Sequence, residues 1–193
     1  MKHLDMVGKP CPMPVVRARK VLQAGEGVTV DVDNEVAVQN LRKMADGEGH
    51  DFSFVQLAGG IFRMSIGARE QVSDVSAAVC NFGEGLLLVT HEQMGDGDPK
   101  LGAMLMKGYI FAQTELAAPP ADIVCLNGGA KLTTAGAATV PDLLTLEAKG
   151  VRIWTCGTCA NFFGITDDLA VGKITDMMNI ATMIAGAVRV VTV

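Results

Sequence analysis

Three prolines surround one cysteine near the start of the chain, in the run Gly8-Lys9-Pro10-Cys11-Pro12-Met13-Pro14, and they leave the backbone little freedom there. A residue that precedes a proline is pushed towards extended dihedrals, so Cys11 suits the cap position in front of a helix. Proline is tolerated in the first helical turn, where the N–H groups lack intrahelical partners. Those N–H groups and the helix dipole attract anions, and a thiolate is an anion. We therefore expect Cys11 to cap a helix and to be reactive.

The first third of the chain alternates short strands with helices. Apolar residues recur at helical spacing in residues 15–22 and again in residues 37–45. Residues 28–32 alternate with the two-residue period of a strand. Two strands around a glycine pair then read as a hairpin. With a short strand ahead of the cysteine, the predicted order is β-α-β-α-β-β, and residues 1–67 are expected to form a two-layer α/β sandwich.

The second half carries apolar strands separated by longer helical segments. Residues 86–90 form a continuous apolar run, which is typical of a strand buried on both faces. Asp98 followed by Pro99 indicates a helix start. Strands that alternate with helices favour a parallel sheet covered on both faces. We predict a three-layer α/β domain with a mainly parallel sheet over residues 86–193, preceded by a linker over residues 68–85.

The composition excludes several classes of function. The net charge of -5 and the pI near 5.1 argue against a general nucleic-acid binder, which needs a basic surface for phosphates. Polar residues interrupt the most apolar stretch, residues 177–193, so no membrane span is expected. The first residues carry no long apolar run, which indicates no signal peptide. Five cysteines without a secretory signal favour a cytoplasmic protein with working thiols.

Two cysteines stand three positions apart in Cys156-Gly157-Thr158-Cys159, directly after the third strand of the second half. Ligands of open α/β sheets bind beyond the carboxyl ends of the strands, so this pair is expected at the functional edge. Two such thiols can form a disulfide, transfer a persulfide or supply half of a zinc site. A structural zinc site needs four ligands, and the sequence has no second Cys-x-x-Cys. Redox or sulfur-transfer chemistry is favoured over zinc and over two thiols that only pack in a turn.

The remaining candidates have simpler interpretations. Cys125 lies between Val124 and Leu126, which favours a thiol in the core. Cys80 falls in the predicted linker. Arg17 and Lys20 share the helix that Cys11 is expected to cap, and they are either solvated residues or the receiving face for an acidic partner.

The start of the chain resembles the signature of the TusA-like (SirA-like) sulfur-carrier family. The likeness covers residues 1–67 and implies a β-α-β-α-β-β fold with a persulfide held on Cys11. It is carried by the Cys-Pro-x-Pro motif and its surroundings: Asp5, Gly8, Cys11, Pro12 and Pro14.

Residues 86–193 resemble the DsrE/DsrF-like family, α/β domains of sulfur-relay proteins that often assemble as oligomers. Leu101-Gly102 after an acidic glycine loop, and a cysteine after the third strand with Gly164 eight positions on, carry this likeness. The sulfur-accepting cysteine of that family falls on Cys156, and Cys159 is an addition to the pattern. The two domains in this order, with Cys-Gly-Thr-Cys, resemble the YedF group of sulfurtransferase-like proteins linked to selenium metabolism.

These resemblances imply transfer of sulfur or selenium from thiol to thiol, with no metal and no organic cofactor. Cys11 accepts the atom as a persulfide, Cys156 receives it, and Cys159 resolves the product by forming a disulfide. The expected partners are persulfide donor and acceptor proteins, a cysteine desulfurase among them, and further copies of the chain joined through the C-terminal domain. A redox-sensitive binding or regulatory module without transfer activity is the alternative function, and a zinc-stabilised structural protein is a third.

Overall fold

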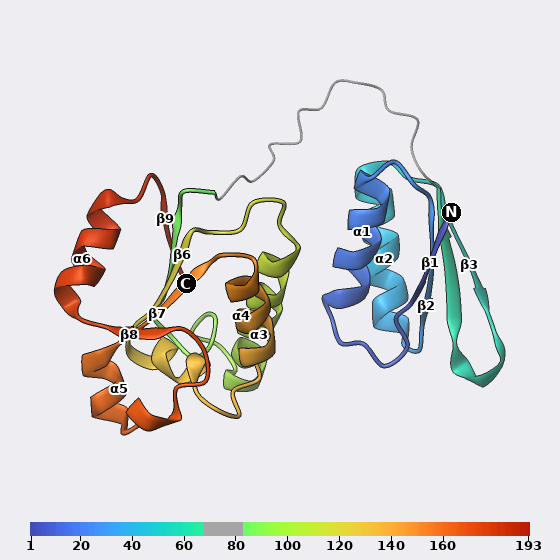
Figure 1. Ribbon diagram of the computed structural model, residues 1–193. Coiled ribbons are helices and arrows are strands. Elements are labelled where there is room, and N and C mark those ends of the chain that lie inside the picture. Colours follow the sequence, from blue (N-terminus) through green and yellow to red (C-terminus); the bar gives the residue numbers. More distant parts are fainter. Residues whose placement is uncertain (68–82) are drawn as a thin grey trace. The chain divides into compact units, whose positions relative to one another are not determined.

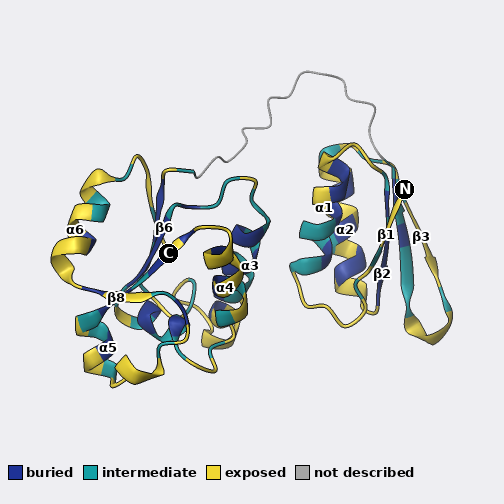
Figure 2. Cartoon of the chain, in the orientation of Figure 1, coloured by how far each residue is buried: buried dark blue, intermediate teal, exposed yellow. Residues whose placement is uncertain are grey.

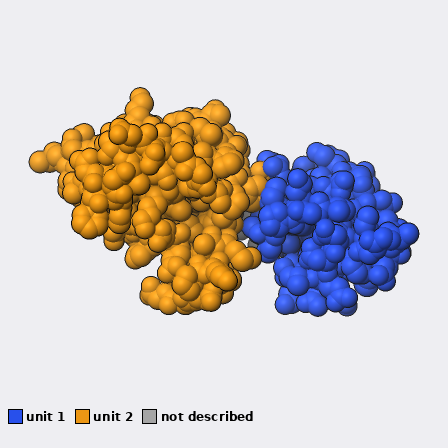
Figure 3. Space-filling model, turned by 90° about the horizontal axis from the view of Figure 1, so that it is seen from below, with its two compact units in different colours: residues 1–76 blue, residues 77–193 orange. Residues whose placement is uncertain are grey.

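The computed structural model describes residues 1–67 and 83–193 (Figure 1). The chain divides into two compact units, Met1–Ser76 and Ala77–Val193 (Figure 3). Most of the predicted linker, and Cys80 with it, lies outside the described residues. Within the described ranges, none of the helices combines the length and the apolar composition that a membrane crossing requires.

The first unit is the predicted two-layer sandwich. Its sheet has the order β1-β2-β4-β3, in which β1 and β2 run parallel and the other neighbours run antiparallel. Both helices lie on one face of this sheet (Figure 1). The elements are β1 (Lys2–Asp5), α1 (Met13–Gln23), β2 (Val28–Val32), α2 (Glu35–Glu48), β3 (Phe52–Gln56), the short 3-10 turn η1 (Ala58–Gly60) and β4 (Phe62–Ile66).

The core of the first unit forms between the two helices and one face of the sheet. Ala18 from α1 and Leu41 from α2 are fully buried, and they pack with Val30 and Met64 from the two central strands. The helical spacing of apolar residues in the sequence therefore matches the buried sides of α1 and α2.

The second unit contains a five-stranded, fully parallel sheet in the order β8-β7-β6-β5-β9. The predicted three-layer α/β class is confirmed, and the sheet is entirely rather than mainly parallel. Its elements are β5 (Leu86–Val89), α3 (Pro99–Glu115), β6 (Asp122–Cys125), η2 (Asn127–Thr133), α4 (Val140–Ala148), β7 (Arg152–Cys156), α5 (Gly157–Phe163), η3 (Thr166–Asp168), β8 (Lys173–Thr175), α6 (Met177–Gly186) and β9 (Val190–Thr192).

Helices cover the two faces of this sheet unequally. On one face, Met106 and Ile110 of α3 and Leu146 of α4 pack against the strands. On the other face, Ile180 is the only residue of α6 that is buried, and Figure 2 shows most of this helix exposed. Cys156 faces the α6 side, whereas Cys125 of the neighbouring strand faces the α3 side.

One local expectation was wrong. Cys11 is not the cap of α1: Pro12 occupies that position, and the Met13 N–H donates to the Pro10 carbonyl oxygen at 3.0 Å, so the chain completes a turn before the helix begins. The residues that follow the Cys-Gly-Thr-Cys run do not have the pattern of a long helix, and the helix that forms there, α5, is only seven residues long. Seven residues are too few for an apolar period to stand out in sequence.

Candidate functional site

Cys11 lies on the surface, in the turn that leads into α1. The peptide bond between Cys11 and Pro12 is cis, and Pro14 is buried in the first turn of the helix. The thiol is therefore held at the end of the sandwich and is open to a partner. This exposure meets the main requirement of a carrier thiol, because exchange needs an accessible sulfur.

A small pocket of about 70 Å³ adjoins the Cys11 thiol. It lies between the Cys11 turn and the beginning of α2, whose residue Asn40 points its side-chain amide at the sulfur with an Nδ2–Sγ distance of 3.9 Å. A donor in this position can stabilise negative charge on the sulfur. The residues that line the pocket are Lys9, Pro10, Cys11, Pro14, Val15, Asn34, Val36, Ala37 and Asn40.

Carboxylates fix the loop between β1 and the cysteine. Asp5 accepts from the Val7 N–H at 3.1 Å, and Asp33 accepts from the Gly8 N–H at 2.8 Å. Gly8 has a φ of 71°, a left-handed conformation that favours glycine. These contacts give two of the motif residues, Asp5 and Gly8, a role in shaping the approach to Cys11.

Asn34 ties this loop to α2. Its side-chain oxygen accepts from the Ala37 N–H at 2.8 Å, which caps the helix, and its amide donates to Asp33 at 3.0 Å. The amide of Asn34, followed by the N–H of Gly8, lowers the pKa of the Asp33 carboxyl. Asp33 and Asn34 were not among the predicted site residues, although an Asp-Asn pair before a helical pattern is a cap signal.

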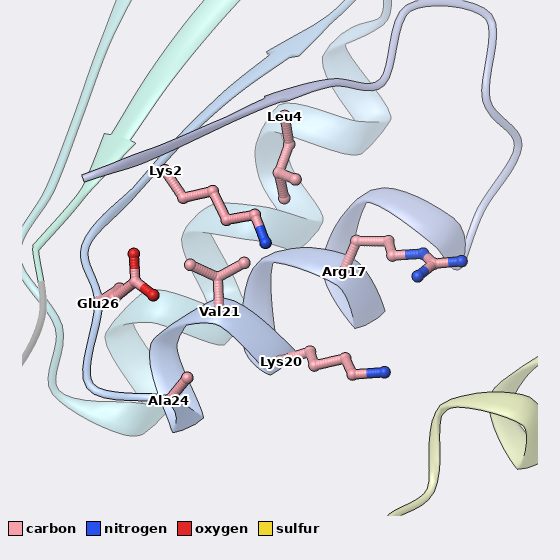
Figure 4. A pocket seen from close by; sticks show the side chains of 7 residues that line it. All are labelled: Lys2, Leu4, Arg17, Lys20, Val21, Ala24 and Glu26. Carbon is pink, nitrogen blue, oxygen red and sulfur yellow. The ribbon is translucent and has the colours of Figure 1, made fainter.

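A second hollow, of about 400 Å³, lies beside α1 and β1 (Figure 4). Lys2 comes from β1, whereas Arg17 and Lys20 come from α1, and Leu4 and Val21 provide an apolar floor. Glu26 supplies a carboxylate at one end. The charged residues of this lining are mainly cationic, a surface of the kind that suits an acidic partner.

The second pair of thiols lies at the carboxyl end of the parallel sheet. Cys156 ends β7 and is only 1% exposed, whereas Cys159, in the first turn of α5, is partly exposed. The backbone N–H of Asn127, directly after β6, donates to the Cys159 Sγ at 3.1 Å. The structure thus brings Cys156 and Cys159 together at the predicted edge, and Cys11 belongs to the other unit.

The loops after β5 and β6 approach each other closely at this edge. A side chain at Gly129 would meet the carbonyl oxygen of Val89 at 2.2 Å, so the close contact requires glycine. Lys131 forms an ion pair with Glu92 at 3.2 Å and lies over the ring of Phe163, 4.8 Å from its centroid. These contacts connect the loop after β5 to α5, beside the dithiol.

Burial changes the acidity of the thiols in this unit. Burial raises the pKa of Cys159, and a hydrogen bond with Cys156 raises it further, while the Asn127 N–H acts in the opposite direction. Cys125 is buried and its pKa is raised to about 12, which agrees with the expected thiol in the core.

Within residues 1–67 and 83–193, no three His, Cys, Asp or Glu side chains are grouped in a way that could hold a metal ion. The four cysteines in these ranges are free thiols.

Comparison with known proteins identifies the first unit. Residues 2–67 match the family described as sulfurtransferase TusA. A protein of Methanocaldococcus jannaschii described as a sulfur carrier is 32% identical over 69 residues, which cover 34% of this chain and 92% of that protein.

Two solved structures also match. The SirA-like protein from Desulfitobacterium hafniense is 42% identical, with a TM-score of 0.35, over 36% of this chain and 100% of its own. The YchN protein of Escherichia coli is 17% identical, with a TM-score of 0.42, over 57% of this chain and 99% of its own. Because the chain covers nearly all of a sulfur-carrier relative at 32% identity, and the family match spans the sandwich that presents Cys11, the chain belongs to the TusA family of sulfur carriers.

Proposed function

We propose that this protein carries a sulfur atom as a persulfide on Cys11 and delivers it to a second thiol station, formed by Cys156 and Cys159. The observation that carries the proposal is the exposed Cys11 thiol, which lies beside a small pocket in a TusA-like unit. Selenium can follow the same route, because attack by a thiolate serves either atom.

The loading step needs only the thiol and a donor. The Cys11 thiolate attacks the outer sulfur of a donor persulfide, so that a new S–S bond forms at Cys11 while the donor's S–S bond breaks. The donor leaves as a thiolate, and the outer sulfur remains on Cys11. The Asn40 amide beside the sulfur is placed to stabilise the anionic forms of this cycle.

The second unit is proposed to be a DsrE/DsrF-like domain, and the whole chain a YedF-like protein. This assignment is supported by a fully parallel sheet that carries two free thiols at its carboxyl edge. Residues 1–67 and 86–193 would then be the two functional domains. Thiol-to-thiol transfer would make the protein sulfurtransferase-like.

The donor is proposed to be a cysteine desulfurase or another persulfide protein with an acidic face. The cationic hollow of Lys2, Arg17 and Lys20 supports this choice (Figure 4). Opposite charges on two partners steer them together and set their orientation.

Loading can be tested with a cysteine desulfurase and ³⁵S-cysteine, followed by mapping of persulfides by mass spectrometry. We expect label on Cys11 in the full chain and its loss in Cys11→Ser. Cys125 is the internal control, because its buried thiol is expected to stay unlabelled. Absence of label on Cys11 in the wild-type chain would contradict the carrier function.

The second unit is also proposed to assemble with further copies through α6. This helix has no charged residue from Met177 to Gly186, and Met178 is 76% exposed (Figure 2). An uncharged face suits a second copy of itself, because no like-charge repulsion opposes the contact. Light scattering should therefore show an oligomer that Met178→Glu dissociates. The matched control is Leu144→Glu, an exposed leucine on α4 at the other face of the sheet. A wild-type monomer would refute the interface.

The contact between Cys156 and Cys159 also supports the alternative of a redox-sensitive regulatory module. In that case the oligomeric state should change with reductant in the wild type but not in Cys156→Ser. A change in assembly without any transfer of sulfur would favour the module over the carrier.

A further inference from the structure

The two thiols of the second unit differ in accessibility. Cys156 is 1% exposed and packs against the α6 side of the sheet with Ile180 and Val124. Cys159 is partly exposed. A persulfide on a partner protein or a small molecule must bring its outer sulfur into line with the attacking thiolate, and this approach is open only at Cys159.

Cys159 also accepts a hydrogen bond from the backbone. The Asn127 N–H points at its Sγ from 3.1 Å, across from the neighbouring strand. Asn127 has a φ of 48°, a left-handed conformation that few residues other than glycine and asparagine adopt readily. Such a conformation at the edge of a sheet, with its N–H directed at a thiol, is typical of a functional position.

From these two observations, and resting on the proposed sulfur-carrier function, we propose that Cys159 receives the sulfur and Cys156 discharges it, with Asn127 as the residue that positions Cys159. This order is the reverse of the one implied by the DsrE/DsrF resemblance. The product is then sulfide, or selenide when selenium is carried.

The chemistry balances in two steps. The Cys159 thiolate attacks the outer sulfur of the incoming persulfide, so that a new S–S bond forms in Cys159–S–SH while the S–S bond of the persulfide breaks and the carrier leaves as a thiolate. Cys156 then attacks the Cys159 Sγ, so that the Cys156–Cys159 disulfide forms and HS⁻ leaves. The sulfane sulfur is reduced and the two thiols are oxidised by two electrons. An external dithiol reductant returns the pair to its starting state for the next turnover.

The position of Cys156 fits the resolving role. Cys156 is the N-cap residue of α5, three positions before Cys159, and the two thiols are joined by a hydrogen bond. A buried resolving thiol is protected from the donor but can reach the sulfur on its neighbour. The reverse order would require the donor to reach a thiol with almost no exposed surface.

The test uses the full chain in a Cys11→Ser background, so that its outcome does not depend on carriage by Cys11. Glutathione persulfide is the donor, free sulfide is measured without added reductant, and persulfides are mapped by mass spectrometry. With the pair intact, we expect one turnover of sulfide and a Cys156–Cys159 disulfide. With Cys156→Ser or Cys156→Ala, a persulfide should accumulate on Cys159, and sulfide release should fall by roughly tenfold or more.

With Cys159→Ser, neither a persulfide on Cys156 nor sulfide release is expected. The rate of persulfide formation is compared between the two single variants. The proposed order would be overturned if Cys156 in Cys159→Ser formed a persulfide as fast as Cys159 does in Cys156→Ser. Trp154 fluorescence confirms that each variant has folded, because this residue lies on β7. The double variant gives the background rate.

Asn127 is tested by a pair of substitutions. Asn127→Gly keeps both the N–H and the left-handed backbone, so the rate of Cys159 alkylation should follow the same pH profile as in the wild type. Asn127→Val disfavours that backbone and should move the midpoint of the profile to higher pH, because the thiolate loses its donor. If Asn127→Gly and Asn127→Val gave the same pH profile of Cys159 alkylation, Asn127 would not be the residue that positions Cys159.

Discussion

The contact of Asn34 with the start of α2 leads to a quantitative prediction about the first unit. The Asn34 side chain accepts from the Ala37 N–H at 2.8 Å, and this is the cap of the helix that lines the Cys11 pocket. Replacing such a cap by alanine costs about 1 kcal/mol of unfolding free energy. For a domain of this size, about 1 kcal/mol corresponds to a fall of roughly 4–8 °C in Tm. At a urea slope of about 1 kcal/mol per molar, it corresponds to a shift of about 1 M in the midpoint.

The composition of the chain allows this shift to be assigned to one unit. The chain has one tryptophan and one tyrosine, Trp154 and Tyr109, and both lie in the second unit. Trp154 fluorescence therefore follows the second unit, while far-UV circular dichroism follows both. In Asn34→Ala, we expect the transition of the first unit to move in the dichroism trace and the Trp154 transition to stay in place.

Asn34→Ser is the matched control, since serine keeps a side-chain oxygen at the cap position. It should retain most of the stability that alanine loses. If serine lowered the midpoint as much as alanine, or if alanine left it unchanged, the capping argument would be refuted.

Three further predictions concern a close backbone contact, a thiol in the core and an ion pair. Gly129→Ala should lower the Tm of the second unit, because the added Cβ would clash with the backbone carbonyl oxygen of Val89. Gly97→Ala is the control and should leave this Tm unchanged, because the space around Gly97 is open. Trp154 fluorescence measures the Tm in both variants. Cys125 should resist iodoacetamide at mildly alkaline pH until the chain is unfolded, since burial raises its pKa to about 12; rapid labelling of the native protein would contradict this. Arg63 donates a hydrogen bond to the Asp31 carboxylate, and this bond lowers the pKa of Asp31. The ion pair therefore stabilises the fold fully at pH values above the ordinary carboxyl pKa. This stabilisation is lost as the pH falls through the lowered pKa of Asp31. Urea unfolding should therefore show Arg63→Met to be less stable than the wild type at neutral pH, with a gap that closes in acid; a gap independent of pH would count against the ion pair.

The sequence alone determined the order of elements in the first unit and the class of both units, whereas β8 and α5 of the second unit were not predicted. Apolar periodicity identified α1 and α2, alternation identified β2, and the Asp98-Pro99 pair marked the start of α3. These signals succeed because they depend on the dihedral preferences and spacing of residues close together in the chain. The Cys-Pro-x-Pro motif located Cys11 in the same way.

Only the tertiary structure decided the surroundings of each thiol. Asp33 reaches the Gly8 loop from 25 residues away, Asn40 reaches Cys11 from 29 residues away, and Asn127 reaches Cys159 from 32 residues away. The unequal burial of Cys156 and Cys159 likewise depends on packing against α6 and on the loop after β6. Local preferences place a cysteine on a strand or a turn, but its hydrogen-bond donors and its exposure come from segments that fold against it. For this reason the sequence located each of these cysteines on a strand or a turn, and the fold determined how each of them is held.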